Sequence, residues 1–230
     1  MSKIALVTGA SGNLGQSVVR KFIEQGYKVV GTVVPNDPAS LNFPPELFQK
    51  KVVDLTNEID SEKFVNTIAA ETNSINAAVL TVGGFAIANV QDTKTSDVFK
   101  QYKLNFETAY NIARPVFLQM MKQGNGRIFL IGSKPGLNSA HSKGMVAYGL
   151  AKSLLFRLAE LMNEEAKGKN IVVSVVVPGT IDTPQNRVAM PESNPENWVK
   201  PESIAEIIHF YCSPEAEVLR EPIIKVYNNS

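Results

Sequence analysis

Short, nearly continuous apolar runs alternate with amphipathic segments along most of the chain. Each run has the length of a buried strand, and the segments between them repeat their apolar residues at helical spacing. The runs expected to form strands are Ile4–Val7, Lys28–Val34, Lys51–Asp54, Ala77–Leu80, Arg127–Ile131, Ile171–Val177 and Ile223–Tyr227. Apolar strands separated by helices predict a parallel sheet covered by helices on both faces. We therefore expect one doubly wound α/β domain of the Rossmann type over residues 1–230.

The amphipathic segments fill the intervals between these strands. One helix follows the first strand and ends before Gly26, and others are expected at about 61–72, 148–166 and 202–211. A long helical region covers about 96–122, in which Pro115 predicts a break or a bend. The stretch 182–200 is rich in Pro, Asn and Glu and lacks regular periodicity, which predicts a mobile substrate loop over a cleft.

A glycine-rich turn, T-G-A-S-G-N-L-G at residues 8–15, joins the first strand to its helix. In this context the glycines let the backbone approach a pyrophosphate, and the helix N-terminus offers amide donors to it. A glycine-rich turn without a ligand is the plainer alternative. The cofactor-binding candidates in the turn are Gly9, Ser11, Gly12, Asn13, Leu14 and Gly15.

Tyr148 and Lys152 lie four residues apart on a predicted helix, so the ammonium can lie near the phenol. A phenol with a pKa of about 10 is a poor acid or base at neutral pH. A neighbouring cation favours the phenolate and lowers that pKa. The spacing alone also fits a solvated helix face. Its place downstream of the glycine turn and of Ser133, at a strand end, favours a catalytic pair.

Composition narrows the class of protein further. The chain has 230 residues, of which 44% are hydrophobic, enough for one large core. Its 23 basic and 22 acidic residues nearly balance, which argues against a nucleic-acid or membrane surface. The chain has a single cysteine, Cys212, so it cannot form an internal disulfide, and this thiol is expected to be buried. The two histidines, His141 and His209, lack the spacing of metal ligands. Without a transmembrane-length run or a signal-peptide pattern, we expect a cytoplasmic protein.

Over essentially its full length, the chain resembles the short-chain dehydrogenase/reductase superfamily. The pieces that carry the resemblance appear in the family's order: residues 8–15, Asp54, Gly83-Gly84, Asn105, Ser133, Tyr148 with Lys152, and Pro178-Gly179. Within the superfamily the chain looks most similar to dihydropteridine reductase-like small reductases. That likeness rests on residues 82–84 and 148–152 and on residues 182–187 followed by Met190, Pro191 and Trp198.

The resemblance implies catalytic roles for four side chains. Tyr148 would be the general acid, and Lys152 would lower its pKa and hold the nicotinamide ribose. Ser133 would polarise the substrate carbonyl, and Asn105 would anchor a water that relays protons from Lys152. Asn105 could instead cap or solvate a helix, Ser139 and Ser142 are rivals of Ser133 in the same loop, and Lys134 is expected to be solvated.

The resemblance also implies further contacts with the cofactor. Asp54 would accept a hydrogen bond from the adenine, although it could be an ordinary turn residue. Gly83 would line the cofactor site, and Pro178, Gly179 and Thr183 would contact the nicotinamide side. No acid ends the second strand to bind the adenosine ribose, and the nearest is Asp37. NADP(H) is therefore favoured over NAD(H), although no arginine follows the second strand to bind the 2′-phosphate.

The sequence thus predicts an NAD(P)H-dependent reductase of a small carbonyl or imine compound. The alternatives are a 3-oxoacyl thioester reductase and a non-catalytic dinucleotide-binding sensor. Met190 and Trp198 either cover the ligand or tie the loop to the core. A homodimer or homotetramer is expected through the long helices after Ser96 and Tyr148, because the second holds more apolar residues than one face needs: Leu154, Leu155, Phe156 and Leu158.

Overall fold

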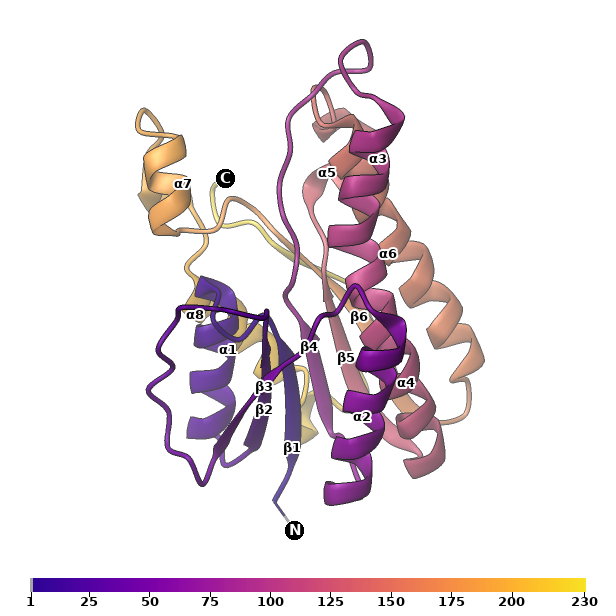
Figure 1. The fold of residues 1–230 in the computed structure, drawn as a ribbon. Coiled ribbons are helices and arrows are strands. Elements are labelled where there is room, and N and C mark those ends of the chain that lie inside the picture. Colours follow the sequence, from indigo (N-terminus) through magenta and orange to yellow (C-terminus); the bar gives the residue numbers. More distant parts are fainter. Residues whose placement is uncertain (1) are drawn as a thin grey trace.

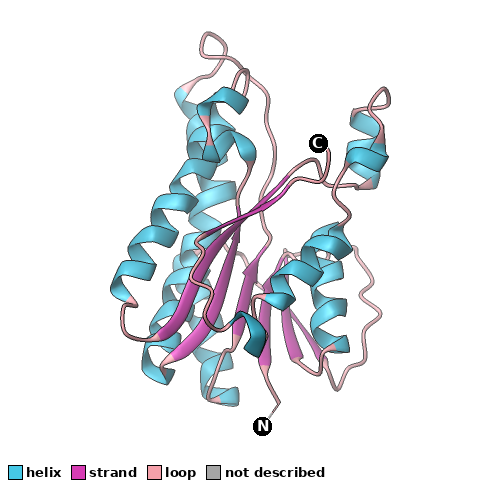
Figure 2. Ribbon diagram, turned by 180° about the vertical axis from the view of Figure 1, so that it is seen from behind, coloured by secondary structure: helices cyan, strands magenta, loops and turns pink. Residues whose placement is uncertain are grey.

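The computed structural model describes residues 2–230, whose seven strands form one parallel sheet with helices on both faces (Figures 1 and 2). The strand order β3-β2-β1-β4-β5-β6-β7 confirms the predicted Rossmann-type architecture. The strands are β1 Ile4–Thr8, β2 Lys28–Val33, β3 Phe48–Val52, β4 Ala77–Leu80, β5 Asn125–Ile131, β6 Asn170–Pro178 and β7 Ile223–Val226. The helices are α1 Asn13–Glu24, α2 Glu58–Thr72, α3 Thr95–Tyr102, α4 Thr108–Gln123, α5 Lys134–Leu137, α6 Val146–Glu165, α7 Pro184–Ala189 and α8 Pro201–Phe210.

Two apolar cores lie on opposite faces of the sheet. Helices α2, α4 and α6 cover one face, where Ile68, Ile112 and Leu155 are fully buried. Helices α1 and α8 pack together on the other face, which buries Phe22 and Ile208. Because both faces are covered, the central strands are apolar along their whole length, which explains why their runs stand out in the sequence.

The third strand begins earlier than the predicted Lys51–Asp54. It starts at Phe48, which pairs with Val29 and meets the ring of Phe43 at 5.0 Å between centroids. As the edge strand, β3 leaves Val52 exposed, and the chain has left the ladder by Asp54. The Val52-Val53 pair therefore marked the end of this strand and not its centre.

A break or a bend was predicted at Pro115, and the break does not occur. Pro115 lies buried inside α4, whose neighbours Ile112 and Val116 are packed in the core. The irregularity comes earlier, at a π-helical turn over Lys103–Glu107 between α3 and α4. Tertiary packing of the apolar face outweighs the one hydrogen bond that the proline removes.

The segment 182–200 contains more regular secondary structure than its sequence pattern suggested. It contains α7 and a 3₁₀ turn at Pro195–Asn197, and a bridge between Ile181 and Val199 closes its base. Trp198 is buried, so it ties the segment to the body of the protein.

Across residues 2–230, no helix combines the length and the apolar character needed to cross a bilayer.

Candidate active site

The order of the strands reverses between β1 and β4, which run side by side while their connections leave in opposite directions. In open α/β sheets, ligands bind at the carboxyl ends of the strands at such a switch point. The glycine turn follows β1 there, and Thr81–Gly84 follows β4. Thr81 ties the two together, because its hydroxyl donates to the Thr8 carbonyl at 2.6 Å.

The glycine turn brings the backbone close to the start of α1. A Cβ at Gly15 would lie 2.1 Å from the carbonyl oxygen of Gly9, so only glycine fits there. The first turn of α1 carries no acidic residue, and its N-cap, Gly12, has no side chain to satisfy the free amides. These unsatisfied donors and the helix dipole suit a phosphate group.

Behind the glycine turn, Asn105 is fully buried in the π-helical turn and fixes the loop after β4. Its Oδ1 accepts from the Gly84 amide at 3.0 Å, and its Nδ2 donates to the Gly84 carbonyl at 3.0 Å and to Gln101 Oε1 at 2.8 Å. A Cβ at Gly83 would lie 2.7 Å from Asn105 Oδ1 and 3.0 Å from Lys152 Nζ. Asn105 is therefore neither a cap nor solvated, and it lies beside Lys152.

Ser133, Tyr148 and Lys152 converge at the end of β5. The buried Ser133 is the N-cap of α5, and its Oγ accepts from the Gly136 amide at 3.2 Å, which leaves the hydroxyl proton to donate. Lys152 Nζ donates to the Ile131 carbonyl at 2.7 Å and lies 6.0 Å from the centroid of the Tyr148 ring. The rival Ser142 instead donates to the Pro135 carbonyl at 2.7 Å.

Burial dominates the acid-base properties of this group. It lowers the pKa of Lys152 from 10.5 to about 8. Burial also raises the pKa of Tyr148, whereas the hydrogen bond with the Ser133 side chain lowers this pKa. The direction for Tyr148 is opposite to the expectation that Lys152 would lower it, because both groups are desolvated and the ammonium is directed at the Ile131 carbonyl.

These side chains line a cavity of about 530 Å³. A second cavity of about 320 Å³ follows the glycine turn, and the two share Leu14, Thr81, Gly83 and Ile181 as walls. Together they make one groove from the start of α1 to Tyr148. Such a groove could hold an elongated dinucleotide, with its phosphates at the glycine turn and its reactive end beside Tyr148.

Of the predicted candidates, all but Asn105 and Asp54 line one of the two cavities. The glycine-turn cavity is lined by Gly9, Ser11, Gly12, Asn13, Leu14, Gly15, Gly83 and Thr183. The larger cavity is lined by Leu14, Gly83, Ser133, Tyr148, Lys152, Pro178 and Gly179. Asp54 lines neither, and its Oδ1 accepts from the amide and the hydroxyl of Thr56 in its own turn, at 2.9 and 2.8 Å. Its role toward an adenine stays a prediction.

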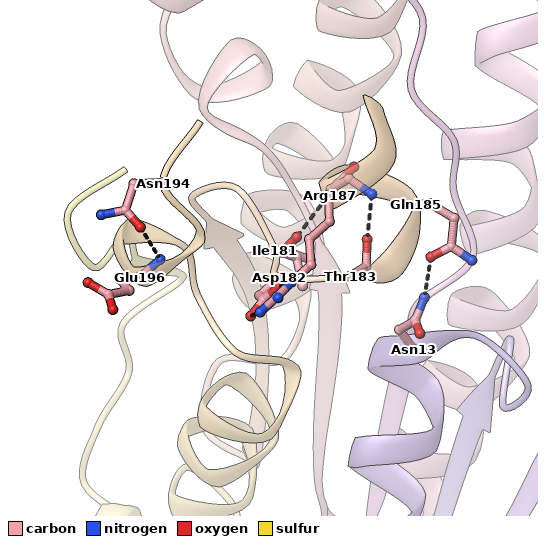
Figure 3. A network of polar contacts seen from close by, with 9 residues as sticks. Asn13, Ile181, Asp182, Thr183, Gln185, Arg187, Asn194 and Glu196 are labelled. Carbon is pink, nitrogen blue, oxygen red and sulfur yellow. Dashed lines mark hydrogen bonds and ion pairs between the residues drawn. The ribbon is translucent and has the colours of Figure 1, made fainter. Parts of the chain in front are cut away.

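Helix α7 lies over the groove and contacts the glycine turn. Thr183 caps the helix by accepting from the Asn186 amide at 3.1 Å, and Gln185 accepts from Asn13 Nδ2 at 2.9 Å across the groove (Figure 3). Met190, at the end of α7, lines the larger cavity, whereas Trp198 does not. Of the two apolar candidates in this segment, only Met190 is therefore placed to meet a ligand.

Sequence reasoning missed Phe85, gave Asp37 no contact with the glycine turn, and misjudged Lys134. Phe85 lines the cavity and meets the Tyr148 ring edge-on at 5.1 Å between centroids; its position directly after Gly83-Gly84 was the available signal. Asp37 accepts a 2.5 Å hydrogen bond from Ser11 Oγ in the glycine turn. Lys134 lines the cavity and is partly buried, not solvated.

Comparison with known proteins agrees with this geometry. A family model described as short chain dehydrogenase matches residues 3–194. The chain is 28% identical over 189 residues to the acetoacetyl-CoA reductase of Acinetobacter sp. (strain RA3849), covering 79% of this chain and 75% of that one. It is 25% identical over 227 residues to the 3-oxoacyl-(acyl-carrier-protein) reductase FabG of Vibrio cholerae, covering 93% and 91%. The crystal structure of gox2181 superposes with a TM-score of 0.86 at 22% identity, covering 98% of this chain and 94% of that one.

Proposed function

Since the chain belongs to the short-chain dehydrogenase family and is an NAD(P)-dependent oxidoreductase, we propose that it reduces a small carbonyl or imine compound with Tyr148 as the proton donor. The observation that carries this proposal is the convergence of Ser133, Tyr148 and Lys152 on a cavity continuous with the glycine turn. When bound, the nicotinamide cofactor supplies the hydride.

The chain's own residues would position the substrate and move the proton. Ser133 keeps a hydroxyl proton to donate to the substrate oxygen, while Tyr148 delivers its proton to the same oxygen or to an imine nitrogen. Lys152, on the next turn of α6, would face the ribose of the cofactor and exchange protons with Tyr148. Pro178 and Gly179 would support the nicotinamide, and Phe85 would exclude water from the Tyr148 ring.

The roles of Tyr148 are tested by Tyr148→Phe, which removes only the proton donor. We expect this variant to bind the cofactor as the unchanged protein does and to lose turnover by at least about 10²-fold, the usual worth of a general acid. Cofactor binding is measured by fluorescence titration and turnover by absorbance of the reduced cofactor. Undiminished turnover by the variant would contradict the proposed role of Tyr148. If the unchanged protein bound neither NADH nor NADPH, the proposed reductase activity would be contradicted.

A second candidate is reduction of a 3-oxoacyl thioester, which the names of the relatives favour. A panel that holds acetoacetyl-CoA, quinonoid dihydropterin and simple aldehydes separates the two candidates. We expect the small carbonyl or imine compounds to give the higher kcat/KM. No turnover of any compound with intact cofactor binding would favour the third possibility, a dinucleotide-binding sensor.

The choice of cofactor depends on Asp37. NADP(H) was favoured because no acid ends β2, but the fold brings Asp37 against Ser11 from the loop that follows. The Ser11 hydroxyl and the Ala39 amide hold the pKa of Asp37 below its usual value, so the carboxylate is charged. A 2′-phosphate bound near Ser11 would be repelled, and the structural argument therefore favours NAD(H).

Exchanging this carboxylate tests the argument. Asp37→Asn should tighten NADPH binding by about tenfold relative to NADH, because the repulsion is removed. Asp92→Asn, an exposed carboxylate after β4 that lines neither cavity, is the matched control and should leave the ratio unchanged. An unchanged NADPH to NADH ratio in the Asp37 variant would leave NADP(H) as the expected cofactor.

The location and the assembly of the protein remain expectations. We propose a cytoplasmic homodimer or homotetramer that acts on small molecules and binds neither nucleic acid nor membrane. The nearly balanced charge supports the last point.

A further inference from the structure

The amino ends of the strands, at the bottom of Figure 1, border a cavity of about 230 Å³. Its walls include Lys3 before β1, Tyr27 before β2, Arg127 near the start of β5 and Asn170, the first residue of β6. The segment after α8 completes it. No residue of this cavity lines the groove of the candidate active site, which lies at the carboxyl ends of the strands. The two sites are therefore separate.

Arg127 provides this cavity with a guanidinium whose acceptors within residues 2–230 are all neutral. Its Nη1 donates to the carbonyls of Gly126 and Asn170, both at 3.0 Å, and its Nη2 donates to Asn170 Oδ1 at 2.9 Å. A guanidinium has five N–H donors, so Nε–H and one Nη2–H remain without an acceptor among the described residues. Arg187 uses the same two atoms, Nε and Nη2, to hold the Asp182 carboxylate. Arg127 thus keeps an edge that suits an oxyanion.

Positive charge exceeds negative charge around this cavity. Lys3 lines it together with Arg127, and Arg220 donates at 3.3 Å to the same Asn170 Oδ1 that Arg127 contacts. Among the described residues, Glu217 is the acidic lining residue, and its Oε1 accepts from Asn170 Nδ2 at 3.0 Å. None of the three cations forms an ion pair within residues 2–230. Three cations against one carboxylate leave an excess of two positive charges.

Two further ionisable groups line the cavity, the Tyr27 phenol and the Cys212 thiol. Burial raises the pKa of Tyr27, and it raises the pKa of Cys212 to about 12. Both are therefore neutral at physiological pH and cannot act as counter-ions. Burial lowers the pKa of Arg127, and the neighbouring Arg220 lowers it further. This direction is expected of a partly desolvated cation without a sufficient counter-charge.

We propose that this cavity is a second ligand site, which binds a small phosphate dianion through Arg127 and Lys3. The Nε and Nη2 groups of Arg127 match two oxygens of one phosphate, and the Lys3 ammonium adds a point charge. A phosphate group carries about −1.5 to −2 charges at neutral pH, which matches the excess better than the single charge of a carboxylate does. The volume of about 230 Å³ limits the ligand to phosphate itself or a small phosphate ester. This site goes beyond the proposed function.

The test is a calorimetric titration of the protein saturated with reduced dinucleotide, which keeps the probes out of the glycine turn. Inorganic phosphate and methyl phosphate are the probes, and acetate at the same ionic strength is the comparison. We expect at least one phosphate to bind at least about tenfold more tightly than acetate. The tighter of the two phosphates then identifies the ligand as free phosphate or as an ester. Arg127→Gln should weaken phosphate binding by about tenfold, and Lys3→Gln by about threefold.

Lys63→Gln is the matched control, because Lys63 is exposed on α2 and does not line the cavity. It changes the net charge as Lys3→Gln does and should leave phosphate binding unchanged. Lys3 is exposed, so Lys3→Gln keeps the inference testable even where the loss of the main-chain contacts of Arg127 unfolds Arg127→Gln.

Two outcomes would overturn the inference: no binding of either phosphate by the unchanged protein, or equal phosphate affinities in the Lys3 and Lys63 variants. A protein that bound no dinucleotide would contradict the proposed function and not this site. The comparison of variants would still locate the probes, because neither Arg127 nor Lys3 lines the groove.

Discussion

Lys152 shows how one buried side chain carries both chemistry and a cost to stability. Within residues 2–230 its ammonium has a single hydrogen-bond acceptor, the Ile131 carbonyl, and burial lowers its pKa to about 8. The folded protein therefore favours the neutral amine more than the unfolded chain does. A group poised near neutral pH can exchange a proton with Tyr148, whereas an ordinary lysine would remain charged.

This pKa predicts a pH dependence of the free energy of unfolding. Between the folded pKa of about 8 and the ordinary 10.5, the unfolded chain binds more protons at Lys152 than the folded protein does. The wild type should therefore gain stability relative to Lys152→Met as the pH rises through this window, by at most roughly 3 kcal/mol. Urea unfolding of both proteins without cofactor measures it.

The comparison with Lys152→Met is essential because other groups act in the opposite direction. Burial raises the pKa values of Tyr27 and Cys212, so each of them lowers the stability of both proteins as the pH rises. The difference between the two proteins cancels these contributions. Parallel pH profiles for wild type and variant would show that Lys152 has an ordinary pKa.

At the scale of elements, the π-helical turn between α3 and α4 gives Asn105 its position. An ordinary helix over the same residues would place this side chain differently, since each π turn adds one residue to the helix. Here the carboxamide pairs with both backbone groups of Gly84 and with Gln101. The turn thereby fixes the loop that forms the wall shared by the two cavities.

We expect Asn105→Ala to destabilise the protein by about 3 kcal/mol, because it leaves buried backbone groups of Gly84 without a partner. Gln101→Ala is the control: it removes one acceptor of Asn105 Nδ2 and leaves both Gly84 contacts, so about 1 kcal/mol is expected. Thermal or urea unfolding measures both. An equal loss in the two variants would show that the Gly84 contacts contribute little.

At the scale of the whole molecule, α6 carries an apolar stripe that the fold leaves exposed. Leu155, Phe156 and Leu158 are buried in the core, so three of the four residues expected at a subunit interface are already used. Leu154 remains 39% exposed, together with Leu150 and Leu161 at 53% and 55%. Helices α4 and α6 lie along one flank of the sheet (Figure 1). Exposed leucines on one helix face are typical of an interface between subunits.

We expect the double variant Leu154→Glu, Leu161→Glu to be a monomer, because two carboxylates would be buried in the proposed interface. Light scattering after size-exclusion chromatography measures the mass. Ile59→Glu with Val218→Glu is the control, since these residues are at least as exposed and lie elsewhere. A control that dissociates equally, or a wild type that is already a monomer, would count against this face.

The sequence by itself determined the order of strands and helices, the glycine turn and the family. These features are local: a strand buried on both faces must be apolar throughout, and a turn that approaches phosphate must lack side chains. The sequence also predicted that Tyr148 and Lys152 lie close together, because their helical spacing places them on one face.

Only the tertiary structure decided which side chains meet across large separations in the chain. It placed Asp37 on Ser11 and Lys134 in the cavity against the segment after β7. It also kept Pro115 within a helix and shifted the edge strand to Phe48. Local periodicity cannot supply these results, because each depends on packing or hydrogen bonds between residues from different elements.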